Sequence, residues 1–517
     1  MKRIALRIKT TKMSDIAIPA EDTASEGSPE KKRAPKLSLG VQVFQNTAAQ
    51  LAGRVIGIFL SAGTSILLAR YLGKEKLGEY GAIYAYLSLY AFFATFCLEQ
   101  ILAREISVRR HQGAELFHTA TVTALGFSIV GAVIAPLLAP LFGYSGMIRW
   151  LIAIAAVDML ILPPLRFGGI IFQVELQLWY NVVIGLIRQA LWLAAVVLLA
   201  LKHAAFYEVI IARTMVGVLE AVVVVWNVRR VNLVRGTRRF ISEDARMMLK
   251  SGLPLVVASL AAGVFLRIDQ VMLHKMSGDV VLGPYVIAVQ LTELFSALPI
   301  ALMVSFFPAF AESAADGERF SRYLGEAYRF LLVVVFAACA LLSPIAHPAI
   351  RAIYGPEFAS TAGLLVVLIW SEVPIFFTAV LNNALIAKNL QRHSPVPAIV
   401  GAVLNVLLNL WAIPRYGALG ASWATVVSYC SGVAYLMFVP KVRPLVMSGL
   451  VTAIKPLVLT LGITAALALL PLAFWWKFIL AAAAYGLGAW AWGVVTQNDL
   501  DRLRSMIAGG MFRRARG

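Results

Sequence analysis

GKEKLGEY (Gly73–Tyr80) and GDVVLGPY (Gly278–Tyr285) both match the pattern G-x-x-x-L-G-x-Y, at an offset of 205 residues from 73 to 278. Each copy lies between two long apolar segments, and six such segments separate the first copy from the second. Because six is an even number, a chain that crosses a membrane at every segment presents both copies in the same orientation. The pattern therefore predicts two parallel repeats, related by an axis along the membrane normal.

The composition excludes a water-soluble globular protein. Of the 517 residues, 60% are hydrophobic and 14% are charged, whereas soluble domains average about 45–50% apolar and about 25% charged residues. The apolar residues form about fourteen segments of about 20 residues, the length of a membrane-spanning helix. They lack the alternation of a barrel strand, so helices are the remaining solution. The predicted spans are 46–70, 79–103, 117–142, 149–172, 178–200, 206–228, 250–273, 282–308, 327–348, 362–386, 396–413, 418–438, 452–472 and 476–496.

We therefore predict an all-α integral membrane fold of about fourteen helices, with two six-helix parallel-repeat lobes and two C-terminal helices. The predicted parts are a disordered cytoplasmic tail (1–44), an N-lobe (45–228), a basic linker (229–246), a C-lobe (247–438), helices 13 and 14 (439–497) and a basic tail (498–517). Two similar lobes with an interface between them are the usual basis of alternating access, with a substrate site near the midplane.

The net charge of +19 reflects membrane topology rather than nucleic-acid binding. Lys and Arg gather on one side of the predicted bundle, including six arginines between Arg229 and Arg246, and the opposite loops carry few. This asymmetry follows the positive-inside rule and predicts that both termini are cytoplasmic. The three cysteines are scattered, so their spacing predicts neither a disulfide framework nor a metal site.

Polar residues inside the predicted spans suggest a substrate cavity, because an ionisable residue there costs about 2.5–3.5 kcal/mol on insertion scales. The residues that we predict to contact an anionic substrate from the first, fifth and seventh spans are Gln50, Arg54, Asn181, Arg188, Arg267 and Gln270. The candidates for ion coupling or charge pairing are Asp158, Asp269 and Glu293. The alternative interpretation is that Arg54, Arg188 and Arg267 form structural ion pairs with these carboxylates, and we favour a structural role for Asp269.

Several short motifs resemble the bacterial polysaccharide flippases, a family in the superfamily of the multidrug and toxic-compound extruders. They are Leu67–Gly73 with Leu77–Tyr80, Arg104–Ile106, Arg267–Leu273 with Gly283–Ala288, and Ile353–Phe358. Together, in this order and spacing, they extend the resemblance over nearly the whole chain from about Gln45. The resemblance implies the extruder fold and a location in a bacterial inner membrane. It also implies a substrate, an undecaprenyl-diphosphate-linked oligosaccharide that is moved to the periplasmic face for exopolysaccharide or O-antigen (lipopolysaccharide) assembly.

Nothing in the sequence suggests ATP hydrolysis or a resident cofactor, so we expect the energy source to be an ion gradient (H⁺ or Na⁺), the membrane potential or removal of the product. The expected partners besides the substrate are membrane lipids, a glycan polymerase and a chain-length regulator. Two alternatives of the same fold stay open: a peptidoglycan lipid-precursor flippase and a drug or ion antiporter. Against the antiporter, the first span carries Arg54 where a coupling carboxylate is expected. A membrane glycan polymerase or ligase is a third alternative, but the outward loops are short and hold no paired carboxylates.

Overall fold

The computed structural model describes residues 39–144, 146–175 and 177–493, and these are helical with no strand. Of the described residues, 39–45 belong to one unit and 46–493 to a second, which is the helical bundle. The α-helices are α1 (Leu39–Ser88), α2 (Ala91–Thr95), α3 (Leu98–Val108), α4 (Gly113–Leu138), α5 (Gly146–Ala155), α6 (Val157–Val174), α7 (Leu178–Leu201), α8 (Phe206–Val228), α9 (Ser242–Ser277), α10 (Asp279–Glu312), α11 (Gly317–Ile353), α12 (Ala359–Leu368), α13 (Glu372–Ala387), α14 (Val396–Leu436), α15 (Arg443–Leu469) and α16 (Phe474–Ala491).

The helices account for the predicted membrane spans. Eleven helical segments of the described chain are long and apolar enough to cross a membrane. Two of these, α1 and α14, each contain two helices joined at a glycine with positive φ, Gly73 (φ 67°) and Gly417 (φ 56°). Counting both halves of α1 and of α14, and adding α16, gives the fourteen spans of the prediction. The predicted fold class, an all-α membrane protein, is confirmed.

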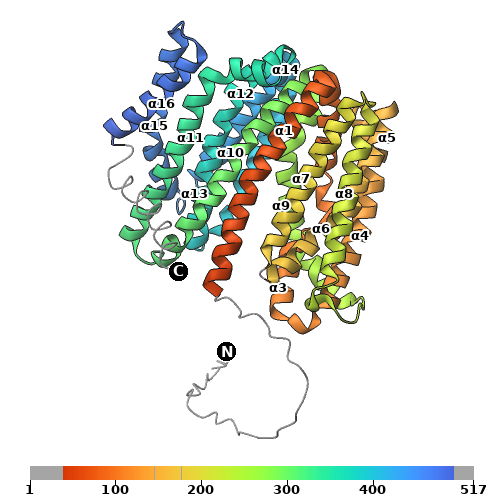
Figure 1. Ribbon diagram of the computed structural model, residues 1–517. Coiled ribbons are helices and arrows are strands. Elements are labelled where there is room, and N and C mark those ends of the chain that lie inside the picture. The colour runs from red at the N-terminus through yellow and green to blue at the C-terminus, as the bar shows by residue number, and fades with distance from the viewer. Residues whose placement is uncertain (1–38, 145, 176, 494–517) are drawn as a thin grey trace. The chain divides into compact units, whose positions relative to one another are not determined.

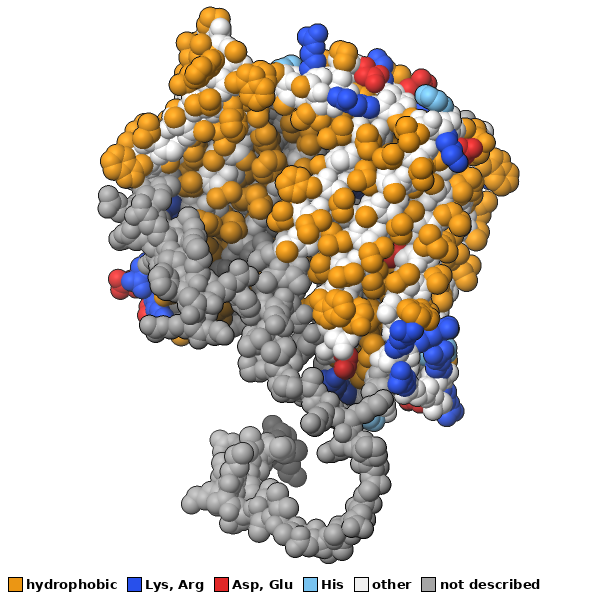
Figure 2. All heavy atoms as spheres, viewed as in Figure 1, with side chains coloured by type: hydrophobic (Ala, Val, Ile, Leu, Met, Phe, Trp, Pro, Cys, Tyr) orange, Lys and Arg blue, Asp and Glu red, His pale blue; other side chains and the backbone are white. Residues whose placement is uncertain are grey.

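Several spans are interrupted rather than continuous. The second is completed by α2 and α3, which are separated at Phe96 and Cys97, two non-glycine residues with φ of 49° and 54°. The pairs α5–α6 and α12–α13 likewise form one span each. Figure 2 shows apolar side chains over the middle of one face of the molecule, with Lys and Arg at its upper and lower ends. This distribution is that of a membrane-spanning surface.

Gly73 and Gly278, the first residues of the two sequence motifs, have the same rare backbone conformation. Their φ and ψ are 67° and 175° at Gly73, and 81° and 170° at Gly278. Only glycine adopts this region readily, because a Cβ would clash with the backbone. The two motifs therefore begin with structurally equivalent turns.

The two motifs also pack directly against each other. A Cβ added at Gly78 would lie 2.0 Å from the Asp279 carbonyl oxygen, and one added at Gly283 would lie 1.9 Å from the Lys74 carbonyl oxygen. Asp279 and Lys74 occupy the same position in the two motifs, so the contact is reciprocal. The second half of α1 and the start of α10 are thus related locally by a two-fold axis, and Figure 1 shows these helices side by side.

A second reciprocal contact closes the same end of the bundle. Arg70 donates hydrogen bonds from Nε to the Ile353 carbonyl oxygen (2.7 Å) and from Nη2 to that of Ala352 (2.8 Å), at the end of α11. Lys275, the equivalent residue at the offset of 205, donates to the Leu141 carbonyl oxygen (2.9 Å), after α4. Cations stabilise the unpaired carbonyls at helix C-termini. These contacts connect the two halves of the bundle at the end that carries the turns at Gly73 and Gly278, which we call the motif end.

The predicted boundaries of the parts stay predictions, although their positions can be stated. Residues 1–38 and 494–517 of the two predicted tails lie outside the described residues, and residues 39–44 belong to α1. The predicted linker contains a short 3₁₀ turn, Asn232–Val234, and α9 begins inside it at Ser242. Superposition of residues 45–228 on 247–438 also stays a prediction beyond the local symmetry of the motifs.

Candidate functional site

A cavity of about 1360 Å³ runs along the inside of the bundle. At one end it is lined by Tyr80 and Tyr354, beside the motif end. At the other end it is lined by Gln173, near the C-terminus of α6, and Asn181, near the N-terminus of α7. Its walls come from both halves of α1 and from α3, α6, α7, α8 and α10, with one residue each from α2 and α5. Pockets for drug-sized ligands measure about 300–1,000 Å³, so this cavity has room for a larger headgroup.

Four of the nine predicted site residues line this cavity: Asn181, Arg188, Asp158 and Glu293. Gln50 and Arg54 lie on α1 with exposed side chains and are not among the residues that line it. Arg267, Gln270 and Asp269 lie on α9 and are also outside the lining. Of the three arginines that the sequence suggested as substrate contacts, the structure therefore brings only Arg188 to the cavity.

Arg188 projects from α7 toward Glu220 of α8. Their ion pair is loose, with 3.3 Å between Arg188 Nε and Glu220 Oε2, and 40% of the Arg188 side chain is exposed. Arg166, from α6, also interacts electrostatically with Glu220. One carboxylate thus interacts with two guanidinium groups. The carboxylate partners suggested from the sequence for Arg188 were different residues.

Arg267 forms an ion pair with Glu293, one of the partners suggested from the sequence. The distance from Arg267 Nη2 to Glu293 Oε1 is 2.9 Å, and the pair joins α9 to α10. Glu293 also lines the cavity. Arg267 therefore lies immediately behind a cavity wall, held there by a carboxylate that faces the cavity.

Asp269 and Gln270 are buried and take part in the packing of α9. Asp269 Oδ1 accepts a hydrogen bond from the Gln270 backbone N–H (2.7 Å), and Oδ2 accepts one from the Tyr285 hydroxyl. Thr425 of α14 donates to the same oxygen at 3.5 Å. These contacts favour the structural interpretation of Asp269.

The sequence analysis did not identify the cluster around Arg213 on α8. The Arg213 guanidinium lies 3.7 Å from the centre of the Tyr84 ring and donates a hydrogen bond to the Tyr80 hydroxyl. Cation–π contacts of this kind are worth about 2 kcal/mol when they are desolvated. Tyr80 is the last residue of the first motif. The sequence signal that could have revealed this cluster was Arg213 itself, an arginine inside a predicted membrane span.

Several polar atoms of the cavity lining are buried without a partner among the described residues. They include the Tyr84 hydroxyl, Asp158 Oδ1 and Gln189 Oε1, and all three side chains contribute to the lining. Buried polar atoms in native structures are almost always hydrogen-bonded, to protein or to water. The cavity wall thus has unused hydrogen-bonding capacity, and its lining also includes the aromatic side chain of Trp192.

The cavity is balanced in charge rather than uniformly cationic. Three arginines line it (Arg166, Arg188 and Arg213), together with the four carboxylates Glu99, Asp158, Glu220 and Glu293. The described residues contain no group of three or more His, Cys, Asp or Glu side chains that could hold a metal ion. What the cavity offers is therefore guanidinium groups that can exchange partners, hydrogen-bonding groups and apolar walls.

Two family models match most of the chain. The model for polysaccharide biosynthesis proteins matches residues 43–314. The model for the lipid II flippase MurJ matches residues 184–496.

Two curated relatives come from Haloferax volcanii. "Probable flippase AglR" is 24% identical, and the match covers 75% of this chain and 81% of the relative. "Probable low-salt glycan biosynthesis flippase Agl15" is 20% identical, with 70% of this chain and 75% of the relative covered.

Solved structures share the fold at low sequence identity. A lipid II flippase MurJ in an inward closed conformation has a TM-score of 0.67 at 15% identity, covering 86% of this chain and 98% of that structure. An inward-facing multidrug resistance MATE family transporter of the MOP superfamily has a TM-score of 0.58 at 16% identity, with 77% and 98% covered. These matches place the bundle in the same fold as both transporters.

Proposed function

From the premise that this chain belongs to the polysaccharide biosynthesis protein family, we propose that it flips an undecaprenyl-diphosphate-linked oligosaccharide across the inner membrane by alternating access. The chain is a multi-pass membrane transporter rather than an enzyme, and its relatives are flippases of glycan biosynthesis. The substrate would enter from the cytoplasmic leaflet and leave on the periplasmic face, for exopolysaccharide or O-antigen assembly.

The observation that carries this proposal is the large cavity, closed at one end, with mixed lining. A lipid-linked oligosaccharide presents a diphosphate, which arginines bind through two parallel hydrogen bonds, and many sugar hydroxyls. Arg188 is exposed to the cavity and only loosely paired, so it can exchange the Glu220 carboxylate for a phosphate. The unpartnered atoms of Asp158, Gln189 and Tyr84 offer hydrogen bonds to a polar headgroup in the cavity. Asp158 and Glu293 remain our candidates for coupling to H⁺ or Na⁺.

The flipping activity itself can be tested with purified protein in liposomes. A fluorescent undecaprenyl-diphosphate oligosaccharide, placed in one leaflet, should become accessible to a membrane-impermeant lectin faster in vesicles with the protein than in protein-free vesicles. A fluorescent phosphatidylglycerol in the same vesicles serves as the control and should not be accelerated. Equal rates for the oligosaccharide lipid with and without the protein would contradict the proposal.

The direction of transport requires a defined topology, and we propose that both termini and the Arg229–Arg246 segment are cytoplasmic. The motif turns at Gly73 and Gly278 would then face the periplasm. Single cysteines introduced into the Cys-less chain at Arg235 and at Lys74 should be labelled by a membrane-impermeant maleimide from opposite sides. Labelling of Arg235→Cys in intact cells, with Lys74→Cys protected, would contradict this topology and indicate the opposite orientation.

A second candidate function, flipping of the peptidoglycan lipid precursor, is favoured by the match of residues 184–496 to the lipid II flippase model. This substrate carries the same lipid diphosphate, so the arginines would act in the same way. The two functions differ in a cellular test. Expression of this chain should fail to rescue a strain that is depleted of its peptidoglycan-precursor flippase, and rescue would favour the second function.

We also propose that a glycan polymerase and a chain-length regulator act on the flipped product.

A further inference from the structure

A second hollow of about 480 Å³ lies on another side of the broken second span. It is lined by Phe96, Phe127, Phe240, Ser242, Ala245, Arg246, Leu249, Lys250 and Leu253, and it shares no lining residue with the large cavity. We refer to these nine residues as the α9 groove. Its walls come from the α2–α3 break, from α4 and from the first turns of α9. The groove lies at the end of the bundle that carries the Arg229–Arg246 segment.

The floor of the groove is aromatic and results from the interruption at Phe96. The positive φ of Phe96 and of Cys97 ends α2 and restarts the span as α3. The Phe96 ring stacks on Phe127 of α4, with 4.3 Å between ring centres and 25° between ring planes. Gly252 lets α9 cross the break closely, because a Cβ there would lie 3.1 Å from the Phe96 carbonyl oxygen.

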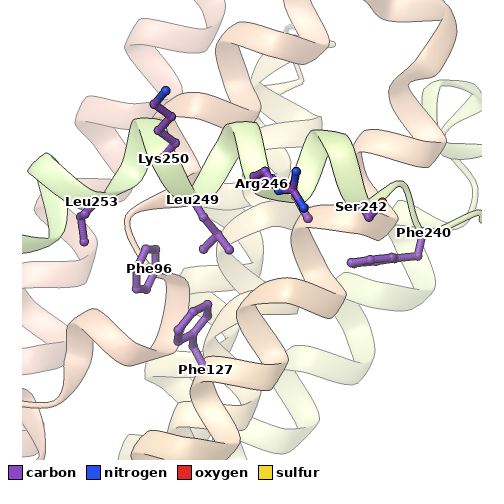
Figure 3. A pocket seen from close by; sticks show the side chains of 9 residues that line it. Phe96, Phe127, Phe240, Ser242, Arg246, Leu249, Lys250 and Leu253 are labelled. Carbon is purple, nitrogen blue, oxygen red and sulfur yellow. The ribbon is translucent and has the colours of Figure 1, made fainter.

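The groove opens outward. Phe240 and Leu253, at its edges, are 45% and 56% exposed, and Val257, one turn further along α9, is 59% exposed. Figure 3 shows Phe96 and Phe127 beneath α9, with Leu249 directed toward them. Exposed apolar side chains on a membrane helix contact hydrocarbon chains, so the groove borders the lipid rather than water.

Two cations accompany this apolar surface. Arg246 and Lys250 are four residues apart on α9 and both are exposed. Lys250 lines the groove but extends from the upper side of α9 in Figure 3, away from the phenylalanines. The nearby carboxylate of Asp244 is engaged by Arg109, at 2.9 Å, and does not neutralise Arg246.

We propose that the α9 groove binds an anionic phospholipid of the leaflet at the basic end of the bundle. Its phosphate would lie at Arg246, with Lys250 as a weaker second contact, and one acyl chain would lie against Phe96, Phe127 and Leu249. A cation beside an apolar hollow complements a lipid, which has an anionic head and a hydrocarbon tail. A free phosphate ion would gain nothing from the aromatic floor.

The test measures lipid binding by the purified full-length protein, for example by native mass spectrometry with added phosphatidylglycerol. Juxtamembrane cations contribute about fivefold each to binding of anionic lipid. We therefore expect Arg246→Gln to weaken phosphatidylglycerol binding about fivefold, and Lys250→Gln to weaken it less. Leu253→Trp, which fills the groove from its exposed edge without changing charge, should also reduce binding.

The matched control is Arg238→Gln, which removes the same charge from the exposed segment before α9 and should change binding less than twofold. Phosphatidylcholine and glycerol phosphate, tested at the same concentrations, should compete poorly. The proposal is overturned if Arg238→Gln and Arg246→Gln weaken binding equally, if Leu253→Trp has no effect, or if glycerol phosphate competes as well as the lipid.

Discussion

Replacement of Gly78 with valine should separate the two motifs and abolish flipping. The new side chain would begin 2.0 Å from the Asp279 carbonyl oxygen, and backbone atoms cannot move aside as a flexible side chain can. The start of α10 would have to shift by about an ångström, and overpacking of this kind costs about 1–3 kcal/mol. Because the contact closes one end of the cavity, we expect flipping to fall at least about tenfold and thermal stability in detergent to decrease.

The repeat provides both a mirror test and a control. Gly283→Val, at the equivalent position, should have the same effect, because its Cβ would meet the Lys74 carbonyl oxygen at 1.9 Å. Gly63 lies in the first half of α1, before the break at Gly73, and a Cβ added there has no atom within 4 Å. Gly63→Val should therefore leave flipping nearly unchanged. If Gly78→Val and Gly283→Val both transport normally, the motif contact has no part in the cycle.

Replacement of Arg188 with alanine should reduce glycan export about a hundredfold while protein abundance in the membrane stays nearly normal. A hydrogen bond to a charged group contributes up to about 3 kcal/mol, and a diphosphate can engage the planar guanidinium through two such bonds. Arg188→Lys should recover only part of the export, because an ammonium group cannot form the bidentate contact. Export measured alongside immunoblots of membrane fractions gives both quantities.

Glu220 separates this role from a purely structural one. Glu220→Gln leaves Arg188 in place without its carboxylate partner, and export should stay within a few-fold of normal. The double variant Arg188→Ala, Glu220→Ala should remain defective, because the proposed phosphate contact is still missing. Recovery of export in the double variant would instead show that Arg188 only balances the charge of Glu220.

The sequence by itself determined the class of fold and the kinship of the two motifs. Span length and composition are local properties of the chain, and in a membrane every backbone polar group must be satisfied within the helix. The fourteen apolar segments therefore predicted the helices without knowledge of their packing. The glycines at 73 and 278 were informative for a similar reason, because their conformation is one that other residues rarely adopt.

Tertiary structure decided which polar residues meet. The direction of a side chain depends on the rotation of its helix, and kinks change that rotation along a single span. Arg54, a predicted substrate contact, lies outside the cavity lining, whereas Arg188 reaches the lining and pairs with Glu220. The Arg267–Glu293 pair and the α9 groove likewise depend on how α9 crosses its neighbours. Periodicity places residues on one face of a helix, but only the packing of the other helices decides what that face contacts.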